Sequence, residues 1–107
     1  ALVILQCIVC FDCFVAKTAT LEITDLSIKS TDTLQVEINS VRGPHTIEIV
    51  VTGETDAACM INDRILGPGK VDTVLTKGDY FGNRYPIRYI PLEAKTGQLK
   101  VEATFFY

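Results

Sequence analysis

The sequence has little clustered positive charge and only one histidine. Its 10 Lys and Arg residues are scattered singly and are outnumbered by 13 Asp and Glu residues, giving a net charge of −3. Because nucleic-acid binding needs grouped cations that neutralise phosphates, the pattern predicts no nucleic-acid partner. His45 follows Gly43-Pro44. With no second histidine and no activated nucleophile marked in the sequence, we expect His45 to be an exposed turn residue.

Familiar site motifs are missing too. Gly67-Pro68-Gly69-Lys70 lacks the spacing and the hydroxyl residue of a phosphate-binding loop, and the aspartates do not follow calcium-loop spacing. No Asn is followed two positions later by Ser or Thr, so sequon glycosylation is not expected. No acid–base pair or metal cluster stands out. We predict a protein that is not an enzyme, with no catalytic residue, no metal and no cofactor.

Charge is almost absent from the first sixteen residues, ALVILQCIVCFDCFVA. Fourteen of them are apolar, and only Gln6 and Asp12 interrupt the run. All other charged residues lie at Lys17 or later. This change in composition predicts an apolar polymerisation segment over 1–17 and a separate folded domain over 18–107.

Apolar residues in the rest of the chain alternate with polar ones, which is typical of half-buried strands. We predict strands over 21–28, 34–38, 47–51 and 99–107. Ser30-Thr31-Asp32 and several glycine-containing segments are predicted turns, and 56–66 is either a strand or a helical turn. The sequence therefore predicts a mainly β domain, a β-sandwich or a barrel.

The apolar segment needs a place to be buried. A helix of sixteen residues is about 24 Å long. A helix that crosses a bilayer needs roughly 20 residues, so this segment is short for a full span. The segment has no initial Met and no basic flank, so we expect a processed chain in which the segment is retained. Burying each large apolar side chain contributes roughly 1.5 to 3 kcal/mol, and exposing about a dozen would be untenable for a soluble monomer. We expect sister subunits to cover it.

A family resemblance supports this expectation. The residues that carry it are ALVILQCIVCFDCFVA, LEITDLSIKSTDTLQVEI, ILGPGKVDTVL and TGQLKVEATFFY. The chain resembles archaeal type IV pilins and archaellins, in which a leader is cleaved just before an apolar helix. The resemblance implies an N-terminal helix in a filament core and an outward, immunoglobulin-like β-sandwich. It also implies an extracellular, cell-surface filament, a homopolymer with a membrane stage only before assembly, and adhesion or motility on surfaces or other cells.

Two alternatives remain open at this point. Residues 1–16 favour strands as well as helices, so the joint between subunits is a helix or a strand donated to the next sandwich. The chain is alternatively a membrane-anchored β-sandwich binding module. Under the filament hypothesis the predicted subunit contacts are Leu2, Val3, Ile4, Leu5, Ile8, Val9, Phe11, Phe14 and Val15.

Three of the four cysteines lie in the apolar segment, with the spacing C-x2-C-x2-C from Cys7 to Cys13. Such spacing occurs in metal sites, but no Gly or Pro here lets the chain curl around an ion. We therefore interpret these cysteines as small packing residues. Cys59 is the only other cysteine, so a Cys13–Cys59 disulfide or an inter-subunit bridge is a hypothesis. Asp12 is expected to have either an ionic partner or solvent contact.

Overall fold

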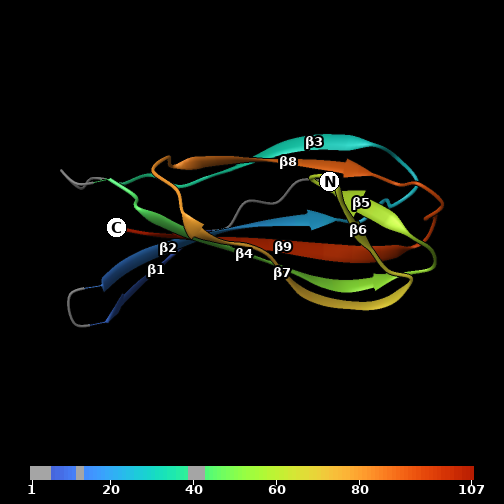
Figure 1. Ribbon diagram of the computed structural model, residues 1–107, viewed down its shortest axis with the longest axis horizontal. Coiled ribbons are helices and arrows are strands. Elements are labelled where there is room, and N and C mark those ends of the chain that lie inside the picture. The colour runs from blue at the N-terminus through green and yellow to red at the C-terminus, as the bar shows by residue number, and fades with distance from the viewer. Residues whose placement is uncertain (1–5, 12–13, 39–42) are drawn as a thin grey trace.

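We describe the fold from a computed structural model. It describes residues 6–11, 14–38 and 43–107, and for 6–11, 14 and 15 it describes the backbone only. The protein is all-β: two antiparallel sheets pack face to face as a sandwich (Figure 1). The β-sandwich predicted from the alternating sequence is confirmed.

In the described part of the chain, nine strands make up the two sheets. The first sheet has the order β1-β2-β9-β4-β7 and the second has the order β3-β8-β5-β6. The strands are β1 (Gln6–Phe11), β2 (Phe14–Ile23), β3 (Ser30–Gln35), β4 (Thr46–Thr55), β5 (Cys59–Ile61), β6 (Arg64–Leu66), β7 (Gly69–Asp79), β8 (Arg84–Ile90) and β9 (Gly97–Phe106).

Successive strands mostly alternate between the two sheets. Without β1, the four-stranded sheets are β2-β9-β4-β7 and β3-β8-β5-β6, which is the strand order of a jelly roll. An immunoglobulin-like domain instead pairs its strands as ABED and CFG. The immunoglobulin-like order is therefore not the one observed. Both architectures share short alternating strands, and the difference lies in which distant strands pair, as β2 does with β9.

The core lies between the sheets. It forms one continuous buried cluster that runs from Ala19 to Phe105. The alternation predicted for the last strand is confirmed: Leu99, Val101, Ala103 and Phe105 are all buried. At about 1.5 to 3 kcal/mol for each large side chain, this cluster is the main stabilising feature of the fold.

The outer face of the first sheet is polar. Thr18 and Thr104 face each other across β2 and β9, with their hydroxyl oxygens 2.9 Å apart. The Lys77 ammonium lies 3.6 Å from the Glu48 carboxylate across β4 and β7. The threonine pair is part-buried and the Lys77 end of the ion pair is exposed. Cross-strand pairs of this kind each contribute roughly 0.2 to 1 kcal/mol, and their main effect is to keep this face hydrophilic.

Several predicted elements need correction. Gln6–Phe11 and the residues from Phe14 onward are strand, so the N-terminal helix is wrong for them. Their backbone groups pair in a hairpin, and their β-branched and aromatic residues suit strands. Residues 1–5 and 12–13, including Asp12, lie outside the described residues.

The body of the chain also shows differences in strand limits. The strand predicted over 21–28 ends at Ile23, because Asp25 accepts hydrogen bonds from the Ser27 N–H and hydroxyl and so forms a turn. Ser30 begins a strand rather than a turn. The open choice at 56–66 resolves as the hairpin β5–β6. β2 runs without a break across the predicted boundary between 17 and 18, and the division into two functional parts stays a prediction.

Candidate functional site

The β1–β2 hairpin forms one edge of the first sheet. Its register runs from Gln6 opposite Ala19 to Phe11 opposite Phe14. The last β2 residue paired with β9 is Ala16, opposite Phe106, so the first residues of β2 extend beyond the end of β9 (Figure 1). Among the strands that the structure describes, β1 therefore has a partner on one side only, β2.

The predicted subunit contacts fall partly on this hairpin. Ile8, Val9 and Phe11 lie in β1, and Phe14 and Val15 begin β2. Leu2, Val3, Ile4 and Leu5 lie outside the described residues. The structure therefore places the backbone of five of the nine predicted residues on one hairpin.

Edge strands expose backbone donors and acceptors, and folded proteins protect them with charge, proline, bulges or short length. The described stretch of β1, with the sequence QCIVCF, has no charged residue and no proline. No register shift interrupts its pairing with β2. β1 therefore lacks the features that stop an edge from pairing with another chain.

The opposite edge of the same sheet is protected. β7 carries Lys and Asp residues along its length, and Leu75 is an extra residue in a bulge opposite Ile49 and Val50. The Arg64 guanidinium donates hydrogen bonds to the Val74 carbonyl at 3.0 Å and the Leu75 carbonyl at 3.1 Å. These interactions occupy acceptors that another strand would use.

The edges of the second sheet are protected as well. β6 has only three residues, too few for extended pairing. β3 carries Asp32 at a half-buried position, on the same alternation as the buried Leu34. A charge on the inward side of an edge strand disfavours a further strand, because addition would enclose the carboxylate.

Within the second sheet, β5 covers only part of β8. Its pairing with β8 stops at Ile61 opposite Tyr89, and Asn62 then continues the pattern with its side chain. The Asn62 Nδ2 donates to the Pro86 carbonyl at 3.0 Å, and its Oδ1 accepts from the Arg88 N–H at 2.8 Å. The backbone N–H of Asn62 donates to the Arg88 carbonyl at 3.0 Å. Asn62 thus replaces two strand hydrogen bonds beyond the end of β5.

The remaining stretch of this β8 edge is also occupied. Pro86 has no N–H to offer, and the Tyr80 hydroxyl donates to the Arg84 carbonyl. This gap in the second sheet is therefore unsuited to an added strand. Asn62 and Asp63 both have positive φ in the β5–β6 turn, and Asn and Asp are common in such hairpin turns. This preference is the sequence signal that could have identified the turn.

A cleft of about 470 Å³ opens beside the gap. Its lining combines two tyrosines with polar residues from the β5–β6 turn and from the outer side of β3 and β8. The tyrosine rings meet edge to face, with centroids 5.3 Å apart. The lining residues are Thr31, Asn62, Asp63, Tyr80, Tyr85, Pro86 and Arg88.

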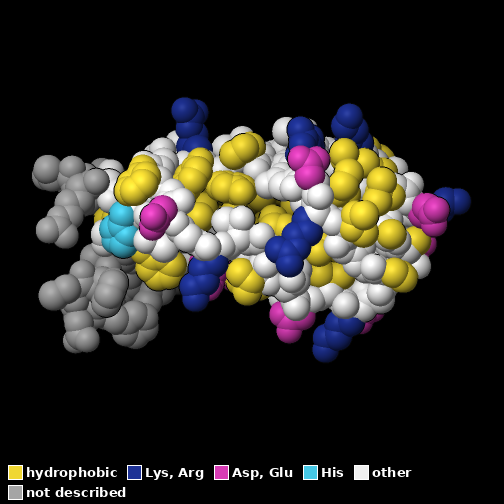
Figure 2. Space-filling model, viewed as in Figure 1, with side chains coloured by type: hydrophobic (Ala, Val, Ile, Leu, Met, Phe, Trp, Pro, Cys, Tyr) yellow, Lys and Arg dark blue, Asp and Glu magenta, His cyan; other side chains and the backbone are white. Residues whose placement is uncertain are grey.

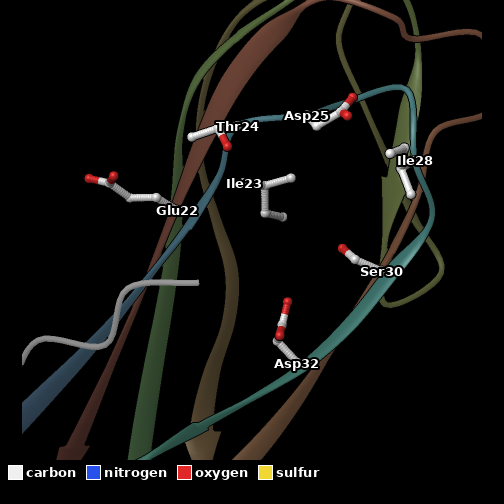
Figure 3. Close-up of a pocket in the computed structure, with 7 residues that line it drawn as sticks. All are labelled: Glu22, Ile23, Thr24, Asp25, Ile28, Ser30 and Asp32. Carbon is white, nitrogen blue, oxygen red and sulfur yellow. The ribbon is translucent and has the colours of Figure 1, made fainter. Parts of the chain in front are cut away.

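A second cleft, of about 360 Å³, lies where β2 leaves the first sheet and β3 enters the second (Figure 3). Glu22, Asp25 and Asp32 line it. The hydrogen bonds from Ser27 hold the pKa of Asp25 below its usual range. In the part of the chain that the structure describes, no three His, Cys, Asp or Glu side chains are arranged to hold a metal ion.

Cys59 is a free, fully buried thiol in this structure. Burial raises its pKa, and its sulfur lies 3.8 Å from the Leu66 carbonyl oxygen. Cys13 lies outside the described residues, so the disulfide hypothesis stays a prediction. A buried thiol with a raised pKa holds little reactive thiolate at neutral pH.

His45 is exposed and lies outside any strand, as predicted, and its ring nitrogen Nδ1 is 2.7 Å from the Thr46 hydroxyl. Figure 2 shows Lys and Arg side chains spread singly over the visible face, without a basic patch there. Among residues 6–11, 14–38 and 43–107, no helix is long and apolar enough to cross a membrane.

No protein-family model matches this chain, and no curated protein matches it either.

Proposed function

We propose that this chain is a structural subunit of an extracellular, cell-surface filament. It polymerises with copies of itself through the apolar N-terminal segment, and the sandwich faces outward for adhesion to surfaces or cells, or for motility. It performs no catalysis and needs no cofactor.

The observation that carries the proposal is the contrast between the sheet edges. β3, β6 and β7 each show a protective feature, whereas the described part of β1 is uncharged, contains no proline and has no bulge. A single chain that stays alone gains nothing from such an edge, because it templates pairing with other chains. A subunit that must pair with its neighbours requires one.

The core of the sandwich supports the same proposal. The buried cluster from Ala19 to Phe105 is continuous, and most of its members are less than 2% exposed. The sandwich therefore has a continuous, well-buried core that is built from residues after Thr18. In this proposal the apolar segment contributes its burial energy, roughly 1.5 to 3 kcal/mol for each large side chain, to contacts between subunits.

The joint that fits this geometry best is strand pairing. β1 is extended backbone in register with β2, and pairing its free side with another copy would continue the first sheet. A helical core of the type IV pilin kind requires residues 6–11 to leave this hairpin. The joint that we propose is therefore strand pairing through β1, and it differs from the helical core that the resemblance to pilins and archaellins implies.

A truncated chain that starts at Thr18 tests the proposal. It keeps the β2 pairing with β9 from Thr18 to Ile23 and the buried cluster. We expect it to unfold cooperatively and to elute as a monomer, whereas the full chain elutes as large assemblies. If full-length and truncated chains are both monomeric, the polymerisation role is wrong. If the truncated chain cannot fold, the segment completes its own sandwich instead.

A matched pair of variants distinguishes strand pairing through β1 from the general hydrophobicity of the segment. Val9→Lys places a charge in β1 without removing the segment, and Val74→Lys places one on the edge that is already protected. We expect the β1 change to abolish assembly and the β7 change to leave it intact. Equal assembly of both variants would contradict strand pairing through β1.

A further inference from the structure

The aromatic cleft beside β8 has walls held in place before any ligand arrives. The Tyr80 hydroxyl is fixed on the Arg84 carbonyl, and its ring packs against Tyr85 and against Phe105, whose centroid is 6.5 Å away. The backbone of Gly82 covers part of the ring so closely that an added Cβ would lie 3.2 Å from it. A preformed aromatic wall loses little conformational entropy on binding.

The loop that carries Tyr80 is itself tied down. The Val36 N–H donates to the Asn83 carbonyl at 3.1 Å, and the Asn83 side-chain amide donates back to the Val36 carbonyl at 3.0 Å. The Tyr80 N–H donates to the His45 carbonyl at 3.1 Å. These bonds join the β7–β8 connection to the segments after β3 and before β4.

The rim of the cleft offers donors and acceptors side by side. One guanidinium nitrogen of Arg88 lies 3.1 Å from each carboxylate oxygen of Asp63. Both side chains are at least half exposed, so Nε and Nη1 of Arg88 and lone pairs of Asp63 stay open to a ligand. The Thr31 hydroxyl adds a group that both donates and accepts. The ion pair leaves the rim without net charge.

This combination selects a class of ligand. A neutral rim gives no advantage to a charged ligand, and the occupied edge of β8 excludes an added strand. A polyproline-type peptide presents carbonyl acceptors and has no use for the Asp63 carboxylate. A sugar ring has an apolar C–H face for an aromatic wall and hydroxyls that both donate and accept hydrogen bonds.

We propose that the cleft binds a neutral saccharide, with the ring against Tyr80 and Tyr85 and adjacent hydroxyls on Arg88, Asp63 and Thr31. Its volume of about 470 Å³ lies within the roughly 300 to 1,000 Å³ typical of small-ligand sites. The proposal rests on the proposed outward adhesion role only for its biological use. Binding itself does not depend on polymerisation.

Saturation-transfer NMR on the full chain tests the proposal, because it reads the ligand and works for monomers and large assemblies alike. The probes are methyl glycosides of glucose, galactose and mannose, and N-acetylglucosamine, with a ten-residue polyproline peptide in parallel. Arg88→Ala removes the rim donor. Arg84→Ala is the matched control, since it lies on the same strand, is exposed, and has only its backbone carbonyl in the contacts around the cleft. Tyr85→Leu removes one ring.

We expect at least one glycoside to receive saturation. Arg88→Ala and Tyr85→Leu should each weaken its affinity at least tenfold, while Arg84→Ala changes it less than twofold. Should Tyr85→Leu fail to fold, the pair of arginine variants still decides. The proposal is wrong if no glycoside receives saturation, if the two arginine variants weaken binding equally, or if only the peptide binds. Electron microscopy of the same sample reports filament formation separately, so failure of this proposal and failure of the filament role are distinguishable.

Discussion

Asn62 gives a sharp test of the claim that side chains complete the edge of β8. Asn62→Asp keeps the shape of the side chain and tolerates the left-handed backbone at this position, where φ is +47°. The carboxylate still accepts from the Arg88 N–H, but it loses the 3.0 Å hydrogen bond to the Pro86 carbonyl. A carboxylate oxygen then faces the Pro86 carbonyl oxygen, and the two acceptors repel each other. A net hydrogen bond contributes about 0.5 to 1.5 kcal/mol, and the facing acceptors add to the loss.

We therefore expect Asn62→Asp to lower the free energy of unfolding by about 1 to 2 kcal/mol. In a domain of this size the melting temperature should fall by roughly 4 to 16 °C, at about 4 to 8 °C per kcal/mol. The assay is urea unfolding at pH 7, with the midpoint and the slope fitted separately.

The neighbouring residue provides the control. Asp63 has a φ of +68° in the same turn, and its pair with Arg88 is exposed. Asp63→Asn should cost at most about 0.5 kcal/mol, because exposed ion pairs contribute little. Equal stability of Asn62→Asp and the wild type, or an equal loss in the two variants, would refute the idea that Asn62 replaces strand hydrogen bonds.

Three further predictions concern stability. Tyr89→Phe should lower the free energy of unfolding by about 1 to 3 kcal/mol, measured by urea unfolding, because it removes the 2.7 Å bond from the buried hydroxyl to the Leu26 carbonyl; an unchanged midpoint would contradict this. Gly53→Ala should prevent folding, as judged by circular dichroism, since its Cβ would lie 2.1 Å from the Gln98 carbonyl oxygen at a φ of +143°. Gly78→Ala should still fold, because the strain of its φ of +156° is not joined by a clash: no atom lies within 4 Å of the added Cβ. Burial raises the pKa of both Cys59 and Tyr89. Each stays neutral in the folded chain where the unfolded chain ionises, so stability should hold below about pH 8 and fall as pH rises through about 8.5 to 10. A pH series of melting temperatures checks this, and a rise in that range would contradict it.

The local features of the fold could be predicted from the sequence because they depend on neighbouring residues. Alternation placed Leu99, Val101, Ala103 and Phe105 on the buried side of the last strand, and the structure confirms it. The end of β2 was missed because the Asp25–Ser27 turn outweighed the continuing apolar pattern. Strand order could not be predicted, since nothing local to Ala19 identifies Ala103 as its partner.

The aromatic cleft shows the same limit. Tyr80 and Tyr85 are close in sequence, but the β5–β6 turn that supplies Asn62 and Asp63 reaches them only through the pairing of β5 with β8. The N-terminal segment illustrates a different one. Its apolar character was plain, whereas its secondary structure was not, because residues such as Ile8 and Val9 suit a strand as well as a helix until a pairing partner is known.

Electron microscopy of the purified full-length chain, at concentrations where the chain starting at Thr18 stays monomeric, is the most direct measurement. We predict long, regular fibres whose formation requires the segment before Thr18. Separate particles of one chain each, under the same conditions, would contradict the proposal that this chain polymerises through its N-terminal segment.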